Sequence, residues 1–263
     1  MRFTKFVVII SIVSLSFLHA PVLQAQALKT AQEIIAASDE IRNPDQPFRL
    51  KTTLTEYRNG KEQDRMVLIV YSKEEKSSGQ FRNLIRFVEP ARDENKLMLK
   101  NGNILWFYDP ASKASVPISP QQRLLGQASN GDVVTVNFHK DYIASSDSEE
   151  TVMDAEKNNR TCLKINLKAA SDTVTYHRIE YWVDCNSYQP VKGKFYSESD
   201  RLLKTAFYRS YREELGKLRP TETIIIDGVD SKLVTKMTYS ELKYRDMPEE
   251  WFQKDYLSRF RGE

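Results

Sequence analysis

The sequence predicts a mainly β fold, in which one large antiparallel sheet follows a single opening helix. Apolar and polar residues alternate with a period of two in about ten or eleven runs, which is typical of half-buried strands. Hardly any helical pattern lies between these runs, so the helical crossovers that parallel strands need are disfavoured. The chain has 263 residues, 40% of them apolar, which suits one globular domain and excludes a disordered chain.

The first residues have the layout of a secretory signal peptide. Arg2 and Lys5 precede an apolar run from Phe6 to Leu18, and the small residues Ala25 and Ala27 follow it. The alternative is a membrane anchor, but the run is shorter than the roughly twenty residues that a spanning helix needs. We therefore expect export and cleavage after Ala27 or Ala25.

The remaining residues, 28–263, are expected to form one domain, because no linker, repeat or shift in composition divides them. Loss of the two cations before the apolar run lowers the formal net charge from +3 to +1. A nearly neutral chain offers no electrostatic basis for binding nucleic acid, so no nucleic-acid partner is expected.

A helix is expected between residues 28 and 42. Ile34, Ile35 and Ile41 recur there at helical spacing, and Pro44 ends the pattern. The expected strands after it are 48–57, 66–71, 84–88, 96–99, 104–108, 160–167, 174–184, 190–196, 203–211, 221–226 and 232–244. Asn-Gly pairs in two of the connections suit tight hairpin turns.

The strand pattern breaks down between Pro117 and Asp147. Residues 121–125 could form a short helix, and residues 132–142 could form a helix or a strand. We expect this stretch to cover one face of the sheet.

The sheet carries more apolar positions than one covered face needs. Residues 97–99 and 105–108 are apolar on both faces. So large a sheet must curl or close, and a curved sheet around an internal apolar cavity would bury both faces. The alternative is a sheet packed on both faces by lids and long loops, without a cavity.

The only two cysteines, Cys162 and Cys185, flank a predicted hairpin. In an oxidising compartment they form a candidate disulfide. Matching the apolar faces of the two strands places the thiols on opposite faces, so a bridge requires a bulge or a twisted strand end. Two buried free thiols are the alternative.

No catalytic, metal or cofactor site is expected. After removal of the signal peptide only His139 and His177 remain, and neither has cysteine or histidine neighbours at zinc-ligand spacing. The sequence contains no G-x-S-x-G, H-E-x-x-H, P-loop or dinucleotide-binding motif. We therefore expect a protein that is not an enzyme.

Several segments of the chain form a recognisable combination of motifs. The most specific is the run from Asn101 to Pro110 (Asn-Gly-Asn-Ile-Leu-Trp-Phe-Tyr-Asp-Pro), preceded by Ile85 to Pro90 (Ile-Arg-Phe-Val-Glu-Pro). Further segments are Arg123 to Gly126, Asn130 to Asp132, Tyr188 to Pro190, Met247-Pro248 and Trp251-Phe252. Together these segments span nearly all of the mature chain and resemble the LolA-like outer-membrane lipoprotein-sorting proteins.

The resemblance implies a half-barrel with lid helices and a cavity for acyl chains. It further implies a periplasmic carrier or chaperone that reversibly sequesters the acyl chains of lipoproteins or lipids for transfer toward the outer membrane. The implied partners are an inner-membrane transporter of the resistance-nodulation-division or ABC type and an outer-membrane acceptor, and we expect a monomer. A sensor or adaptor of the same fold is an alternative, and a hydrolase with an unrecognised site is a third.

The resemblance also implies roles for individual residues. In the family, an arginine on an early strand hydrogen-bonds the lid backbone, and Arg86 matches it, although Phe-Val-Glu intervenes before Pro90 where the carriers have proline directly. A surface arginine is the alternative. The residues expected to line the cavity or lid are Leu84, Val88, Met98, Trp106, Tyr108 and Leu124. Trp106 and Tyr108 share a strand face and could equally be ordinary core aromatics.

Overall fold

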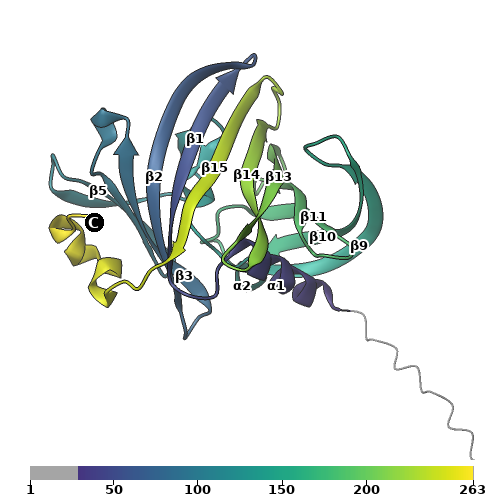
Figure 1. The fold of residues 1–263 in the computed structure, drawn as a ribbon, viewed down its shortest axis with the longest axis horizontal. Helices are drawn as coiled ribbons and strands as arrows, with labels where there is room; N and C mark the ends of the chain where they lie inside the picture. Colours follow the sequence, from purple (N-terminus) through teal and green to yellow (C-terminus); the bar gives the residue numbers. More distant parts are fainter. Residues whose placement is uncertain (1–28, 263) are drawn as a thin grey trace, which may run out of the picture.

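The computed structural model describes residues 29–262, so the expected signal peptide and its cleavage sites lie outside the described residues. Within this range thirteen antiparallel strands form one curved, open sheet (Figure 1). Its strands are β1 (Phe48–Arg58), β2 (Lys61–Glu75), β3 (Gln80–Glu89), β4 (Leu97–Asn101), β5 (Ile104–Asp109), β6 (Ala114–Ile118), β9 (Tyr142–Met153), β10 (Asn159–Ala169), β11 (Arg178–Asp184), β12 (Pro190–Tyr196), β13 (Leu202–Glu214), β14 (Lys217–Asp227) and β15 (Leu233–Tyr244). The prediction of a large curved antiparallel sheet is confirmed.

The sheet is a meander whose two halves join at the chain's first and last strands. The strand order is β6-β5-β4-β3-β2-β1-β15-β14-β13-β12-β11-β10-β9. Neighbouring strands of this sheet follow each other in the chain, except for β1 and β15. Several of the other neighbouring strands are joined by tight turns. At Asn59-Gly60 both residues have positive φ (50° and 74°), the conformation that two-residue hairpin turns require.

Short helices and a small hairpin cover parts of the sheet. Helix α1 (Ala31–Arg42) begins with a capping box, in which Thr30 and Glu33 hydrogen-bond each other's backbone N–H, and these bonds lower the pKa of Glu33. The other elements are β7 (Arg123–Leu125), β8 (Ala128–Ser129), α2 (Phe138–Asp141) and the 3₁₀ helices η1 (Ala91–Asp93), η2 (Asn130–Asp132), η3 (Glu249–Phe252) and η4 (Lys254–Arg259). The expected helix 28–42 is confirmed where the structure describes it.

Each face of the sheet has a buried core, and the two cores are covered by different segments. The larger core lies on the face that packs against α1 and the lid segment, which we define as residues 119–141; we call this the inner face. On the outer face a second core forms between β2–β5 and the C-terminal helices η3 and η4. Figure 1 shows α1 and α2 beside β13 and β14, and the C-terminal helices at the other side of the molecule, next to β5.

The structure differs from the sequence prediction mainly between residues 110 and 153. Residues 123–125 form a strand, β7, and not a short helix. Residues 132–142 contain the end of η2, an extended stretch and α2. Two strands, β6 and β9, were missed, which raises the count above the expected ten or eleven. They are the two edges of the sheet, where strands often carry charged residues or proline; β9 is largely polar and β6 contains Pro117, so neither shows a clear apolar alternation.

Among residues 29–262 no helix is both long and apolar enough to cross a membrane. This finding concerns the described helices alone.

Candidate ligand cavity

A cavity of about 130 Å³ lies between the inner face of the sheet and the lid. Its floor comes from β1, β2, β13, β14 and β15, and its roof from the C-terminal end of α1 and residues 132–136 of the lid segment. The lining residues are Arg42, Asn43, Pro44, Phe48, Leu50, Thr52, Val70, Asp132, Val133, Val134, Thr135, Val136, Tyr208, Glu214, Arg219, Pro220, Thr221, Thr223, Tyr239, Ser240 and Leu242.

A second cavity of about 90 Å³ adjoins the first beneath the same lid. The two share the lining residues Arg42, Asp132, Val134, Val136, Tyr208 and Thr223. Pockets for drug-sized ligands usually measure roughly 300–1,000 Å³. With the lid in this position the first cavity therefore has room for only part of a long chain, and a complete chain requires the lid to move.

The cavity wall is apolar but also carries hydroxyl groups. Leu50, Val70 and Val134 supply aliphatic surface, whereas the hydroxyls of Thr223 and Tyr239 hydrogen-bond each other at 3.2 Å. Burial raises the pKa of the Tyr239 hydroxyl, so it stays neutral at physiological pH. The wall thus combines aliphatic surface with hydroxyl groups.

The middle of the lid segment is bound to the floor by a buried polar cluster. Ser72 on β2 and Asn83 on β3 are fully buried and lie directly opposite each other. The backbone N–H of Thr135 donates to Asn83 Oδ1 at 2.9 Å, and Asn83 Nδ2 donates to the Thr135 carbonyl at 3.0 Å. These bonds satisfy both backbone groups of Thr135, which lies between η2 and α2 and belongs to no helix or strand.

The lid hairpin β7–β8 touches the floor at Gly126. This residue has φ +53°, and a Cβ there would lie 2.3 Å from Thr235 Oγ1, so a larger residue would push the hairpin away from β15. The next residue, Gln127, donates its N–H to the same Thr235 hydroxyl at 2.7 Å.

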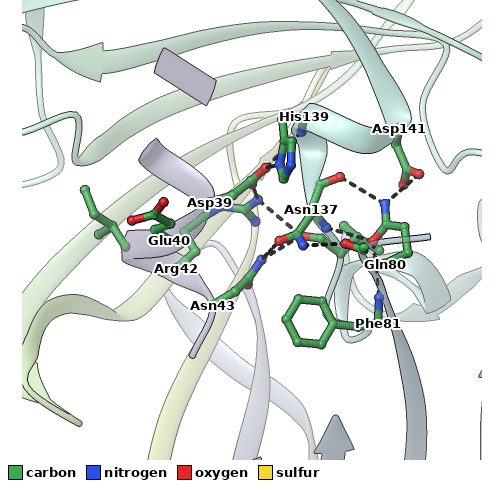
Figure 2. Close-up of polar contacts among 12 residues, drawn as sticks. Asp39, Glu40, Arg42, Asn43, Gln80, Phe81, Asn137, His139 and Asp141 are labelled. Carbon is green, nitrogen blue, oxygen red and sulfur yellow. Dashed lines mark hydrogen bonds and ion pairs between the residues drawn. The ribbon is translucent and has the colours of Figure 1, made fainter. Parts of the chain in front are cut away.

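A buried carboxylate joins α1 to α2, as Figure 2 shows. Asp39 on α1 is 2% exposed. Its Oδ2 accepts hydrogen bonds from the backbone N–H of His139 at 2.8 Å and contacts His139 Nδ1 at 2.9 Å, while its Oδ1 accepts from Arg42. The Arg42 guanidinium also lies 4.1 Å from the centre of the Phe138 ring. Asp39 therefore holds three groups of the two helices in one place.

The same network continues to the β2–β3 hairpin (Figure 2). Asn43 Nδ2 donates to Asn137 Oδ1 at 2.7 Å, and Asn137 Nδ2 donates to the Gly79 carbonyl at 2.8 Å. Gln80 Nε2 donates to Asp141 Oδ1 at 2.7 Å. Burial raises the pKa of Asp141, although the nearby Lys100 cation opposes this shift. We call the network of Asp39, Arg42, Asn43, Gln80, Asn137, His139 and Asp141 the latch.

A second buried ion pair ties the lid to β13. Lys204, 3% exposed, forms an ion pair with Asp132 of the lid and donates to the Gln127 carbonyl at 3.3 Å. Tyr176 donates its hydroxyl to the other Asp132 oxygen at 2.7 Å. Burial lowers the pKa of Lys204, and the Asp132 carboxylate opposes this shift.

The structure separates the predicted cavity residues onto two faces. Met98 is fully buried in the inner core, and Leu124 packs against that core. Leu84, Val88, Trp106 and Tyr108 lie instead in the outer core, under the C-terminal helices. The last four therefore line no lid cavity in this structure, because strand alternation places them on the face opposite to Met98.

Arg86 does not contact the lid. Its Nε and Nη2 donate to Asn95 Oδ1 at 3.3 and 3.0 Å, and it lies beside Gly262 near the end of the chain. Like Leu84 and Val88, it points to the outer face. Within residues 29–262, Arg42 does contact the lid, at the Val136 carbonyl and the Phe138 ring.

Both cysteines are free thiols in the structure. Cys162 lies opposite Asp184, and the N–H of Cys185 bonds to the Thr161 carbonyl at 3.2 Å. Consecutive residues of a strand point to opposite faces, so the two thiols are on opposite sides of the sheet. Two buried free thiols were the alternative to a disulfide; both thiols are free here, but Cys185 is only partly buried.

Sequence reasoning missed Asp39, Arg42, Asp132 and Lys204, which hold the lid. One usable signal was present. Asp39 follows Ile35 by four residues, so the helical spacing places this carboxylate on the same buried face as the apolar residue. A charged residue on the apolar stripe of a helix is a candidate for a buried ion pair.

Comparison with known proteins agrees with this architecture. A family model that is described only as "uncharacterized protein" matches residues 79–259. A crystal structure of a LolA superfamily protein from Nitrosomonas europaea is 32% identical in sequence, with a TM-score of 0.78, and the match covers 87% of this chain and 100% of that one. No curated protein matches the chain.

Two more distant structures share the fold. A DUF1329 family protein from Desulfovibrio piger has a TM-score of 0.73 at 20% identity, covering 86% of this chain and 97% of that one. A domain described as an outer membrane lipoprotein-sorting protein, from Vibrio parahaemolyticus, has a TM-score of 0.72 at 19% identity, covering 87% and 98%. These two likenesses concern the fold alone, whereas the 32% identity to the N. europaea protein over its whole length shows that the chain belongs to the LolA superfamily.

Proposed function

We propose that the protein is a carrier that reversibly encloses the acyl chain of a lipid or lipoprotein between the lid and the inner face of the sheet. The observation that carries the proposal is the cavity under the lid, lined by aliphatic side chains and closed by α1 and residues 132–136. Membership in a superfamily that includes a lipoprotein-sorting domain supports it. The transfer needs no covalent chemistry.

The polar contacts of the latch would allow the lid of such a carrier to open and close. Enclosing hydrocarbon is favourable by about 0.8 kcal/mol per CH₂ group, so a long chain would be released very slowly from a rigid cavity. The lid is held by hydrogen bonds and ion pairs, whose net contributions are about 0.5–3 kcal/mol each because water competes for the same groups. A polar latch can therefore open without destroying the apolar core of the sheet.

We further propose that the carrier works in the periplasm, after cleavage of the N-terminal signal sequence. Its cargo would come from a transporter of the inner membrane, of the resistance-nodulation-division or ABC type, and pass to an acceptor in the outer membrane. Support for this setting comes from the layout of residues 1–27 and from the superfamily. A carrier that hides acyl chains from water would serve transfer between two membranes.

Uptake of cis-parinaric acid, a fluorescent fatty acid, by the purified mature protein tests the proposal. The wild-type protein should bind it, and Val134→Trp should lose most of the binding, because Val134 lines both cavities and the indole would fill them. Val116→Trp is the matched control. Val116 is 47% exposed on edge strand β6, and tryptophan there should leave uptake unchanged.

Two results would contradict the proposal. If the folded wild-type protein takes up no probe, it has no acyl-chain cavity. If Val134→Trp binds as well as the wild-type protein, the chain lies somewhere other than under the lid.

A further inference from the structure

Arg219 occupies an unusual position at one end of the cavity. It begins the row of inward-facing residues on β14, ahead of Thr221 and Thr223, and is only 3% exposed. All three residues line the first cavity. The row starts beside the β13–β14 turn, so Arg219 lies at the cavity end nearest that turn, and Thr223 lies further along the strand.

The known contacts of Arg219 are with neutral oxygens. Its Nε donates to the Glu214 carbonyl at 3.0 Å, and its Nη1 donates to the carbonyls of Glu40 and Ile41 at 3.2 and 2.7 Å. These two carbonyls belong to the last turn of α1, where a cation is favourable. Within residues 29–262, Nη2 donates no hydrogen bond.

No carboxylate forms an ion pair with Arg219 in the described part of the chain. The other two cations that line the cavities each have one, because Arg42 pairs with Asp39 and Lys204 with Asp132. Burial lowers the pKa of Arg219, and the acids Asp45 and Glu214 oppose this shift through longer-range attraction without an ion pair. A buried charge without a counter-ion is costly, and an anionic ligand would offset that cost.

We propose that Arg219 binds the anionic headgroup, a carboxylate or a phosphate, of an amphiphile whose chain runs into the cavity. This inference rests on the proposed carrier function and narrows its cargo to anionic lipids. The planar guanidinium still has the Nη2 donors to offer, and arginine is suited to both carboxylate and phosphate. Beyond the headgroup, Leu50, Val70 and Val134 supply the aliphatic surface that a chain would contact.

Glu214 opposes this ligand in part. It also lines the cavity, and as a carboxylate it repels an anion. Glu214→Gln should therefore strengthen the binding of anionic amphiphiles and leave that of neutral ones unchanged. The effect is opposite in sign to that of removing the Arg219 charge, so the two variants form a pair.

The test is calorimetric titration of the mature protein with laurate, dodecyl phosphate and dodecanol, which share one chain length and differ in the headgroup. The wild-type protein should bind at least one of the two anions about tenfold or more tightly than dodecanol, as expected for a hydrogen bond to a charged group. Arg219→Gln should abolish this preference and keep dodecanol binding. Arg209→Gln, on the outer face of neighbouring strand β13, is the control that should keep the preference.

The results separate this inference from the carrier proposal. Equal affinity of the wild-type protein for all three ligands would overturn the role of Arg219 but leave a carrier cavity. Absence of binding for all three would overturn the carrier itself. If Arg219→Gln fails to fold, the fallback is Arg219→Lys combined with Glu214→Gln, which keeps the positive charge at position 219. This double variant should still bind an anionic ligand more tightly than dodecanol. Loss of that preference in a folded Lys variant would contradict the inference. Comparison of laurate with dodecyl phosphate identifies which headgroup the site prefers.

Discussion

At the scale of single residues, buried charges decide how the lid is held. Asp39 is the centre of the latch, since it bonds the backbone and ring of His139 on α2 and the guanidinium of Arg42 on its own helix. Its carboxylate accepts bonds that an amide can replace only in part, because an amide has a single acceptor oxygen. The latch should therefore weaken when this one charge is removed.

Asp39→Asn should destabilise the protein by about 1–3 kcal/mol, the cost of leaving buried donors unsatisfied, and should speed the release of bound parinaric acid. Stopped-flow displacement and urea denaturation measure the two effects. Asp230→Asn is the matched control, because Asp230 is exposed and its side chain accepts a hydrogen bond from the Lys232 N–H in the β14–β15 turn, outside the latch. Arg86→Leu, on the outer face, should also leave release unchanged. Faster release in Arg86→Leu than in Asp39→Asn would contradict the conclusion that Asp39, and not Arg86, holds the lid.

The Lys204–Asp132 pair should show strong coupling. Lys204→Met alone leaves Asp132 as an unpaired buried charge and should cost about 3–5 kcal/mol, whereas Lys204→Met with Asp132→Asn should cost clearly less. A double-mutant cycle of unfolding free energies measures the difference. Costs that simply add would show that the two groups do not interact.

The same pair predicts a pH dependence. Burial lowers the pKa of Lys204 in the folded protein below the ordinary value of 10.5, which applies to the unfolded chain. At pH values between the folded and the unfolded pKa, the unfolded chain therefore binds more protons than the folded one. Stability contributed by this group therefore rises with pH through that window. The rise should be missing in the double variant, and an identical pH profile for both proteins would refute the shift.

The thiols provide a separate residue-scale prediction. Denatured protein should titrate two free cysteines, and in the folded protein Cys185 should react faster than Cys162. Cys162 is fully buried, and burial raises its pKa to about 12, so it holds almost no thiolate at neutral pH. Absence of any reactive thiol after denaturation would show a disulfide instead.

At the scale of elements, the C-terminal helices form a second cover for the sheet. Tyr71 on β2, Trp251 on η3 and Phe260 pack edge to face, with ring centroids 4.9–5.9 Å apart. Phe252 is fully buried beside them, and the Asn101 side chain donates to its carbonyl at 2.8 Å. The outer face of β2–β5 is thereby buried without the lid.

Phe252→Ala should destabilise the protein by about 3–5 kcal/mol, as expected for an aromatic side chain removed from a packed core. It should also increase the fluorescence of a hydrophobic dye, because the apolar outer face becomes exposed. Thermal unfolding and dye binding measure the two effects. Val229→Ala is the control, since Val229 is 88% exposed, and a similar loss in both variants would contradict the packing role of η3.

The elements that the sequence predicted are those with a strong period. All eleven expected runs coincide with strands, although β11 begins at Arg178 and not at residue 174. The edge strands were missed because β9 is largely polar and β6 contains Pro117. The face of Trp106 and Tyr108 could not be predicted, because a period of two shows that they share a side but does not show which side the lid covers.

At the scale of the whole molecule, the two faces of the open half-barrel are covered by separate segments of the chain. The lid cavity uses β1, β2 and β13–β15, whereas the C-terminal cover uses β2–β5. Polar contacts close the inner face, and aromatic packing closes the outer one. Lid movement therefore need not disturb the outer core.

The central claim is that the cavity under the lid holds an acyl chain. Mature protein purified from a periplasmic fraction would be extracted with organic solvent, and the extract analysed by mass spectrometry beside that of Val134→Trp. The account predicts a long-chain lipid in near-stoichiometric amount from the wild-type protein and little from the variant. A clean wild-type extract from protein that also takes up no parinaric acid, or equal lipid from both proteins, would contradict it.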